Sequence, residues 1–517
     1  MKFHIKEYPE LLQTVEAMPV EELLKCVVCP HVDTKEPVSA GHTYVASFLF
    51  TSEQENHAKC IRSINEGRTT PSLFAGDMEA GAAGAFREAT PFPAFQALAV
   101  GGDEQAAYEL GAVCAAEALQ DGIHWSFAPC VDITGNHNNP IVSFRCSGDS
   151  TEANIRFGGA YMRGMQDNGV IATPKHFPGD GYDTNDQHLT VGVNPLDMPQ
   201  WRESFGRTYH ELIEQGAKSI MAGHIALPAY DPLDEELGYA PPATLSKKLL
   251  TDLLRGELGF DGIIISDAAT MGGFAGCMNL YRACARFLEC GGDCLLFVHA
   301  DEEFVREVAK WMERGELSLA TLRNRAYRML CFARQYWEET ASLRPAYDYT
   351  KEKALALSEA ITDRACVIVR DRHGQLPLTL PKQAKILHVV LDDETYPANA
   401  AAALTEALRE CYDSVEELHD PGPWQLSDLA RSGAYDQIIC SVGSTLSYGT
   451  NSCRLTGPMA RNMMEGWMRY QTPVVFVNFG HPYFHEDYLC SVDTMINTYG
   501  FTPSTVKYVM QRLTQPS

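Results

Sequence analysis

Short apolar runs alternate with longer segments of helical periodicity along the first part of the chain. Eight such runs occur, at residues 26–29, 45–50, 72–75, 125–128, 170–173, 219–222, 262–266 and 294–298. Several are separated by helix-like segments, among them 104–119, 150–168, 199–215 and 246–258. Short buried strands that alternate with helices indicate a parallel sheet, and eight of them predict a (β/α)₈ barrel of the TIM type.

A second region of α/β character follows the predicted barrel. Helical periodicity continues to about Glu339, residues 341–350 have the composition of a linker, and strands and helices alternate again from residue 351. A chain of 517 residues is also too long for one ordinary core. The predicted fold class is therefore α/β, with a barrel domain over residues 1–340 and a smaller α/β sandwich domain over residues 351–517.

Polar side chains of the kinds used in catalysis follow six of the apolar runs. They are Asp77, Asp132, Lys175 with His176, His224, Asp267 and His299. Each position alone could be a helix cap or an ordinary loop residue. Barrel enzymes, however, build their sites at the carboxyl ends of the strands, so six such positions on one face predict an active site there.

The stretch from Val170 to His188 is the most polar of these strand ends. It opens as an apolar strand, turns at prolines and glycines, and ends in a loop that holds Asp186 and His188. Two side chains at this spacing can meet in a turn. A carboxylate that contacts an imidazole fixes its tautomer and raises its pKa, which suits a proton donor at neutral pH.

Asp267 directly follows the apolar run 262–266. A carboxylate is costly to bury at such a place without a partner or a task. It is therefore either one half of a structural salt bridge or a nucleophile on a rigid strand. If Asp267 attacks a sugar and His188 delivers a proton, the pair performs a double displacement through a covalent glycosyl-enzyme, with retention of configuration.

Composition limits the partners of such a site. The formal net charge is −25, which argues against nucleic acid and anionic membranes and favours a neutral small molecule. An apolar leader and a run of about 18 apolar residues are both lacking, and the sixteen cysteines are scattered singly, so a cytoplasmic location is expected. Cys26 and Cys29 have CxxC spacing; buried strand thiols are expected there, with a redox or zinc pair as the alternative.

Several segments together form a recognisable set of motifs. They are Lys-His-Phe-Pro-Gly at 175–179 with Asp-Gln-His at 186–188, Gly-Phe-Asp-Gly at 259–262 with Ser-Asp at 266–267, Ala-Pro-Cys-Val-Asp at 128–132 with Arg-Cys-Ser-Gly-Asp at 145–149, and Asp-Met-Glu-Ala-Gly at 77–81. The set resembles glycoside hydrolase family 3, in its β-N-acetylglucosaminidase branch. The dyad loop and the strand before Asp267 are its specific parts, and residues 364–378 resemble the start of the family's second domain.

The resemblance implies a role for each of seven residues. Asp267 would be the nucleophile, His188 the acid/base and Asp186 the partner that orients it. Four side chains would bind the sugar, namely Asp77, Arg145, Lys175 and His176. The implied activity is that of a retaining, exo-acting β-N-acetylhexosaminidase, which acts on a small glycoside or oligosaccharide and needs neither a cofactor nor a metal.

The chain departs from the family pattern at three places. Asp180 stands where the branch has a second histidine, and Gln187 stands between the dyad residues where the branch has serine. The alanine-rich residues 82–85 replace arginines that help to fix the substrate, and Arg87 is out of register with them. Loss of a bidentate donor changes what a site binds, so a muropeptide sugar is not implied.

Other activities remain open at this point. Phosphorolysis is one, because a deprotonated histidine carries no negative charge that would repel phosphate, and β-glucosidase activity is another. A metal-dependent barrel hydrolase would use His176, His188, His224 and Asp267 around zinc, although no HExxH or His-x-His motif accompanies them. The alanine-rich stretch also permits a sugar-binding homologue without turnover.

Overall fold

The structure is a computed structural model that describes residues 1–35, 43–392, 399–444, 446 and 448–515. The chain forms two compact units. The first comprises Met1–Thr90, Asp103–Asn136 and Cys146–Ala354. The second comprises Pro91–Gly102, His137–Arg145 and Leu355–Ser517. Two short segments of the predicted barrel domain thus belong to the second unit.

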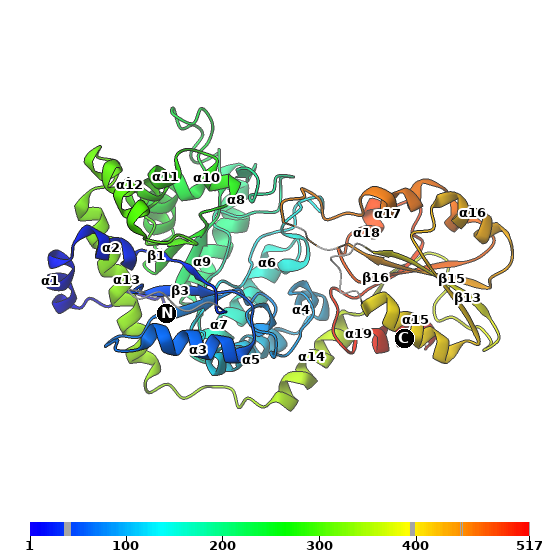
Figure 1. Ribbon diagram of the computed structural model, residues 1–517. Helices are drawn as coiled ribbons and strands as arrows, with labels where there is room; N and C mark the ends of the chain where they lie inside the picture. The colour runs from blue at the N-terminus through cyan, green and yellow to red at the C-terminus, as the bar shows by residue number, and fades with distance from the viewer. Residues whose placement is uncertain (36–42, 393–398, 445, 447, 516–517) are drawn as a thin grey trace. The chain divides into compact units, whose positions relative to one another are not determined.

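Two parallel sheets form the centre of the first unit (Figure 1). One has the strand order β1-β11-β10-β8 and the other β2-β3-β4-β5-β6. The strands are β1 (Val28–Cys29), β2 (His31–Val32), β3 (Ala46–Leu49), β4 (Leu73–Gly76), β5 (Trp125–Ser126), β6 (Ile171–Ala172), β8 (Ser219–Ala222), β10 (Ile263–Ala268) and β11 (Cys294–Leu296), with a separate pair β7 (Gly192–Val193) and β9 (Ile225–Ala226). Each predicted apolar run overlaps one of these strands, which confirms the α/β class with parallel sheets.

The predicted closed barrel is not formed as one continuous sheet among the described residues. β1 pairs with β11, whereas β2 pairs with β3. Pro30, which has no N–H to donate, lies between β1 and β2 and separates them. Between β6 and β8 the pairing is reduced to an isolated bridge from Phe177 to Ala222. Pro174 and Pro178 remove backbone donors from this segment, so a regular ladder does not develop there.

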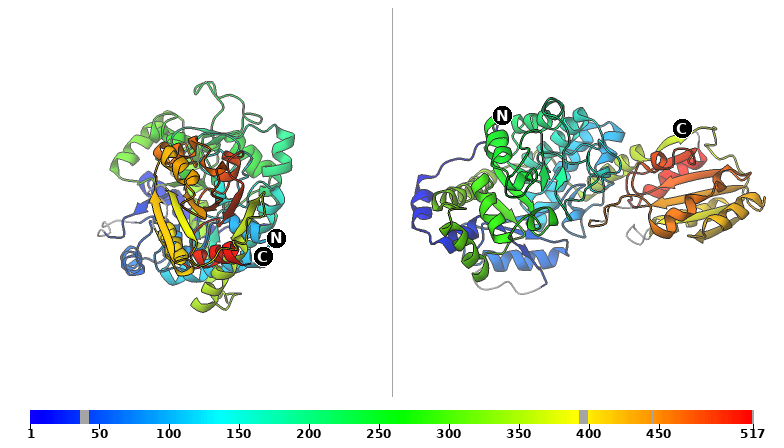
Figure 2. Two further views of the ribbon diagram at one scale, coloured as in Figure 1. Left: turned by 90° about the vertical axis from the view of Figure 1, so that its right-hand side faces the viewer. Right: turned by 90° about the horizontal axis from the view of Figure 1, so that it is seen from above.

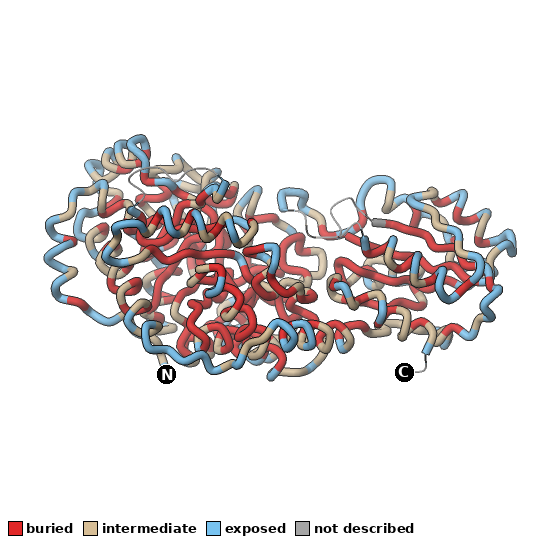
Figure 3. The backbone as a smooth tube through the Cα atoms, turned by 60° about the horizontal axis from the view of Figure 1, so that its bottom comes forward, coloured by how far each residue is buried: buried red, intermediate tan, exposed pale blue. Residues whose placement is uncertain are grey.

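Helices surround these sheets, whose strands are the most buried part of the unit (Figures 2 and 3). They are α1 (Pro9–Ala17), α2 (Val20–Cys26), α3 (Gln54–Asn65), α5 (Glu104–Asp121), α6 (Thr151–Ala153), α7 (Gly159–Asp167), α8 (Met198–Trp201), α9 (Arg207–Glu214), α10 (Gly272–Ala275), α11 (Leu280–Cys290), α12 (Glu302–Glu313) and α13 (Leu319–Thr340), with π-helical turns η3 (Asn154–Gly158), η4 (Arg202–Gly206) and η6 (Lys248–Glu257). The Asp103 side chain caps α5, and Gly122 ends it in a left-handed conformation. No helix in the described part of the chain has the length and apolar character to cross a membrane.

The predicted strand at 26–29 is shorter than expected, because α2 ends at Cys26 and β1 begins at Val28. Both thiols of the CxxC segment are buried. Burial raises the pKa of Cys26 to about 12 and raises that of Cys29 as well. Protonated, buried thiols are poor nucleophiles and poor metal ligands, which disfavours the redox and zinc alternatives.

A six-stranded sheet with the order β12-β17-β16-β15-β13-β14 forms the second unit. Its strands are β12 (Val367–Asp371), β13 (Lys385–Asp392), β14 (Ser414–His419), β15 (Gln437–Gly443), β16 (Val474–Asn478) and β17 (Thr494–Asn497), of which β12 is antiparallel to β17. Its helices are α4 (Gln96–Gly101), α14 (Lys351–Ala365), α15 (Asn399–Cys411), α16 (Pro423–Arg431), α17 (Gly457–Arg461), α18 (Phe484–Asp487) and α19 (Thr505–Thr514), and α14 begins in the first unit. α15 and α19 cover one face and α16 to α18 the other, each over its own apolar cluster (Figure 1).

Candidate active site

Asp267 lies near the end of β10, the longest strand of the first unit. β8 and β11 flank this strand, and its isoleucines are buried. The Oδ1 atom of Asp267 accepts a hydrogen bond from its neighbour Ala268 N–H at 2.8 Å. Its Oδ2 atom lies 3.8 Å from Nε2 of His176. The carboxylate therefore faces another predicted site residue rather than a remote ion pair.

The charges around Asp267 keep its carboxylate ionised. Burial alone would raise the pKa of this group. Interactions with the side chains of His176, His224 and Lys175, together with the Ala268 N–H, outweigh burial and hold the pKa of Asp267 below its usual value. An ionised carboxylate on a rigid strand is the state that nucleophilic attack requires.

His176 is held in place by Asp132. The Nδ1 atom of His176 lies 2.7 Å from Oδ2 of Asp132, and the His176 N–H donates to Oδ1 at 3.2 Å. Cys130 approaches the same carboxylate, with Sγ 3.2 Å from Oδ2. These three side chains offer ligand atoms close enough for a metal ion, but hydrogen bonds among them already account for the cluster. The contact with Asp132 orients the ring so that Nε2 is the atom nearer Asp267.

Lys175 forms ion pairs with two carboxylates, those of Glu79 and Asp77. Its Nζ atom lies 2.7 Å from Glu79 Oε1 and 3.2 Å from Asp77 Oδ1. The lysine side chain is 5% exposed, whereas that of Asp77 is 50% exposed and open to a ligand. Glu79 was not among the predicted ligands, although it lies in the same acidic segment as Asp77. Its position two residues after Asp77 was the signal that could have found it.

Asp186 and His188 meet in a tight turn. Nδ1 of His188 lies 2.8 Å from Asp186 Oδ1, and the same oxygen accepts the His188 N–H at 2.8 Å. The main chain closes the turn, because Leu189 and Thr190 donate their N–H groups to the carbonyl of Asp186 at 2.9 and 3.0 Å. Asp186 is buried and His188 is 30% exposed. A buried carboxylate thus orients an imidazole whose far side can be reached.

This turn packs on the start of α10, the short helix that follows β10. Gly272 donates its N–H to the His188 carbonyl at 2.8 Å, and Gly273 donates to the Gln187 carbonyl at 3.1 Å. A Cβ atom on Gly272 would lie 2.4 Å from the Leu189 carbonyl oxygen, so a side chain there would displace the turn. Sequence reasoning missed both glycines. The turn of the dyad is therefore connected to Asp267 through the start of α10, a few residues beyond β10.

His224 lies close to these groups, but its contacts are not those of the zinc ligand considered from the sequence. Its Nδ1 atom contacts Thr244 Oγ1 and its Nε2 atom contacts the Ala268 carbonyl, each at 3.0 Å. Burial lowers the pKa of His224, and its charge interactions include Asp267 and His188. Because both ring nitrogens are hydrogen-bonded, His224 is not disposed as a zinc ligand. The four-ligand metal site considered from the sequence is not supported.

Two other predicted positions have contacts of their own. The ring of His299 packs against that of His31, with centroids 4.8 Å apart. Arg145 belongs to the second unit, where it donates to the Ile141 carbonyl at 3.0 Å and lies 5.7 Å from the Tyr448 ring centroid. Its part in sugar binding stays a prediction.

The alanine-rich segment forms a short 3₁₀ turn, η1 (Ala82–Gly84). Gly84 lies so close to the Asp77 carbonyl that a Cβ atom would approach its oxygen to 2.3 Å. Arg87, the next cation along the chain, is 65% exposed and pairs with Glu53 at 3.5 Å. This arginine therefore does not take the place of the arginines in the family pattern.

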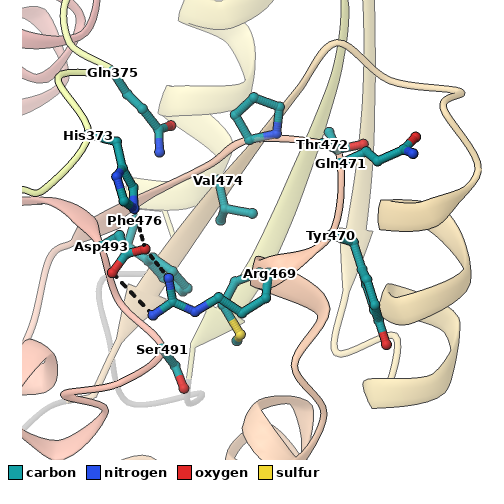
Figure 4. A pocket seen from close by; sticks show the side chains of 12 residues that line it. His373, Gln375, Arg469, Tyr470, Gln471, Thr472, Val474, Phe476, Ser491 and Asp493 are labelled. Carbon is teal, nitrogen blue, oxygen red and sulfur yellow. Dashed lines mark hydrogen bonds and ion pairs between the residues drawn. The ribbon is translucent and has the colours of Figure 1, made fainter.

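A polar pocket in the second unit offers no comparable chemistry among its described lining residues (Figure 4). Its acidic lining residue, Asp493, accepts hydrogen bonds from Arg372 at 3.1 Å, from His373 at 3.0 Å and from Arg469. Partial burial raises the pKa of Asp493, but the bonds from Arg469 and His373 outweigh it, so the pKa lies below its usual value. A carboxylate shared between two guanidinium groups and an imidazole is a structural polar cluster.

The first unit is thus an α/β structure whose strand ends assemble an ionised carboxylate and an oriented imidazole, the groups needed for nucleophilic and acid–base chemistry. Residues 33–332 match the family described as "Glycosyl hydrolase family 3 N terminal domain". The chain belongs to glycosyl hydrolase family 3.

Curated relatives and solved structures extend this similarity. A beta-N-acetylglucosaminidase/beta-glucosidase of Cellulomonas fimi is 28% identical over 97% of this chain and 92% of its own length. A beta-hexosaminidase of Methylobacillus flagellatus is 32% identical over 50% of this chain and 74% of its own length. The solved structure of a beta-glucoside phosphorylase superposes with a TM-score of 0.88 at 27% identity, covering 99% of this chain and 95% of that one.

Proposed function

We propose that this protein is a retaining, exo-acting β-N-acetylhexosaminidase that hydrolyses terminal N-acetylglucosaminides. The observation that carries the proposal is the Asp186–His188 dyad, whose turn is hydrogen-bonded to the start of α10, just after the strand of Asp267. A histidine in the acid/base position marks the N-acetylglucosaminidase branch, since the glucosidase branches use a carboxylic acid there. The names of two relatives, one with hexosaminidase and one with N-acetylglucosaminidase in it, support the same sugar.

The proposed reaction has two steps. In the first, a carboxylate oxygen of Asp267 attacks the anomeric carbon while the glycosidic C–O bond breaks and protonated His188 gives its proton to the leaving oxygen. In the second, neutral His188 takes a proton from water, and the water oxygen displaces Asp267 from the anomeric carbon. Asp186 holds the imidazole in one tautomer and one orientation.

The proposed sugar ligands are Asp77, Lys175, His176 and Arg145. Asp77 is half exposed beside Lys175, so its carboxylate can accept hydrogen bonds from hydroxyl groups. His176 faces the carboxylate of Asp267 and is positioned to contact a sugar bound there. The scaffold for this site is proposed to be of the (β/α)₈ type.

Phosphorolysis is a second candidate, favoured by the similarity to the beta-glucoside phosphorylase over nearly the whole chain. Phosphate would replace water in the second step, and a phosphate oxygen would then displace Asp267 to give a glycosyl phosphate. A neutral imidazole does not repel an incoming phosphate as a carboxylate base would.

A panel of p-nitrophenyl β-glycosides, each assayed with and without inorganic phosphate, tests both candidates. The proposal expects fastest cleavage of the N-acetylglucosaminide, at a rate that phosphate leaves unchanged, with the free sugar as product. Acceleration by phosphate together with a sugar phosphate product would establish the second candidate. Cleavage of the glucoside alone would refute the N-acetylhexosaminidase assignment.

A further inference from the structure

Gln187, which lies between the two dyad residues, has a buried side chain. It is 1% exposed. Its Oε1 atom accepts the His224 N–H at 3.0 Å, and its Nε2 atom lies 3.3 Å from Oδ2 of Asp180. Because a main-chain N–H can only donate, the contact with His224 fixes which end of the amide is oxygen. The amide thus bridges two segments that follow different strands.

Asp180 is itself anchored at the end of the β6 segment. Its own N–H donates to Asp132 Oδ1 at 2.8 Å, and its Oδ1 atom accepts the Gly181 N–H at 2.6 Å. Asp132 is the residue that orients His176. The Asp180 carboxyl group is therefore fixed to the same frame as the proposed sugar ligands, and Gln187 connects the turn of His188 to that frame.

The other end of the Gln187 amide leads toward the nucleophile. His224, whose N–H it accepts, contacts the carbonyl of Ala268 through Nε2, and Ala268 N–H in turn bonds to Asp267. The main-chain carbonyl of Gln187 also accepts from Gly273, just beyond β10. One buried side chain thus ties the acid/base turn to both the frame of His176 and the neighbourhood of Asp267.

We propose that Gln187 and Asp180 form a positioning pair that sets where the His188 ring stands relative to Asp267. The two residues are the ones that depart from the family pattern around the dyad, and the structure shows that they contact each other. A shorter side chain at 187 would reach neither Asp180 nor His224 in the same way. The proton transfer therefore depends on a buried hydrogen-bonded bridge through the Gln187 amide.

The role of Gln187 rests on the proposed function, because Gln187 is proposed to act through His188, the proton donor. The dependence of the rate on the leaving group tests this role. Gln187→Met keeps the volume and removes both hydrogen bonds. For phenyl N-acetyl-β-glucosaminide, which needs protonation, kcat/KM is expected to fall about 10- to 100-fold, since misplacing a catalytic group by about 1 Å costs up to about 10²-fold. For the 2,4-dinitrophenyl glycoside, which leaves without a proton, kcat/KM is expected to stay within about 3-fold.

Gln335→Met is the matched control. Gln335 is also buried and bridges the Lys6 N–H and the Glu339 carboxylate, but it lies on α13. Its replacement is expected to lower the two rates equally or not at all. Equal loss for both leaving groups in Gln187→Met, or no loss for either, would overturn the positioning role.

Different observations would refute the assigned sugar and the positioning role of Gln187. If the wild-type enzyme cleaves glucosides instead of N-acetylglucosaminides, the assigned sugar is wrong, and the same leaving-group comparison is made with glucosides. A crystal structure of Gln187→Met gives a readout independent of turnover. The positioning role expects the 186–190 turn to shift or lose order while Asp267 keeps its bond to Ala268 N–H, and an unchanged turn would contradict it.

Discussion

The two halves of the proposed catalytic pair are held in different ways. Asp267 stands on a six-residue strand that has a hydrogen-bonded neighbour on each side. His188 stands in a turn outside regular structure, fixed by Asp186, by the main chain of Gly272 and by the bridge through Gln187. The nucleophile's place thus follows from the sheet, whereas the proton donor's place depends on a few individual contacts.

This difference indicates at which positions a substitution can change activity while the fold is kept. Many backbone hydrogen bonds to the neighbouring strands fix the backbone of β10, so replacing a single side chain nearby is expected to leave the position of Asp267 unchanged. A turn held by a few side-chain bonds changes when one of them is lost. Substitutions around His188 are therefore expected to change the rate of proton transfer before they change the stability of the protein.

Removal of the nucleophile has the largest expected effect. Asp267→Ala should lower kcat by on the order of 10⁴- to 10⁶-fold with any β-glycoside substrate, because no covalent intermediate can form. Steady-state rates with p-nitrophenyl substrates measure this. Asp252→Ala, at an exposed carboxylate on η6, is the control and should keep wild-type activity. Substantial turnover by Asp267→Ala would show that another group attacks the sugar.

Removal of the proton donor has a smaller effect that depends on the leaving group. His188→Ala should reduce kcat/KM about 10²- to 10⁴-fold for substrates whose leaving group needs protonation, and much less for a 2,4-dinitrophenyl glycoside. Asp186→Asn should act in the same direction with a smaller loss, because it disturbs only the orientation of the ring. A uniform loss across leaving groups in His188→Ala would contradict the role of His188 as the acid.

The smallest expected effect concerns the pH dependence of stability. Burial, together with the negative charges of Asp132 and Asp183, raises the pKa of Asp180 from its ordinary 3.8 to about 7, against the opposing charge of His176. The native state thus holds a proton that the unfolded chain releases. The stability that this group contributes is present below pH 3.8 and is lost as the pH rises through about 7.

The variant Asp180→Asn has no such proton. Its thermal unfolding temperature, measured from pH 5 to pH 8, should fall less steeply with pH than that of the wild type. Asp252→Asn, at the exposed carboxylate of η6, should follow the wild-type curve. If Asp180→Asn and the wild type show the same slope, Asp180 does not hold a proton in the native state.

Sequence patterns predict the strand positions of the first unit well, because buried parallel strands are continuous apolar runs. They do not predict β14, whose segment Ser-Val-Glu-Glu-Leu-His is a half-exposed edge strand without an apolar run. Nor do they predict that prolines interrupt the pairing at Pro30 and between β6 and β8. Closure of the sheet into a barrel needs backbone N–H donors between every pair of neighbouring strands, and an apolar run does not report them.

The candidate site shows the same limit. Spacing predicts that Asp186 and His188 can meet, because both lie in one turn. It does not predict that Glu79 approaches Lys175 more closely than Asp77 does, or that Gln187 reaches Asp180 and His224. Those contacts join segments far apart in the chain, and only the folded main chain decides which side chains come within reach.

The most direct test of the account is to trap the glycosyl-enzyme. A fluorinated N-acetylglucosaminyl fluoride that forms the intermediate quickly and releases it slowly would be added to the protein of residues 1–517, and the labelled peptide would be identified by mass spectrometry. The account predicts one sugar per chain, attached to Asp267. A label on any other residue, or turnover with inversion and no covalent label, would contradict it.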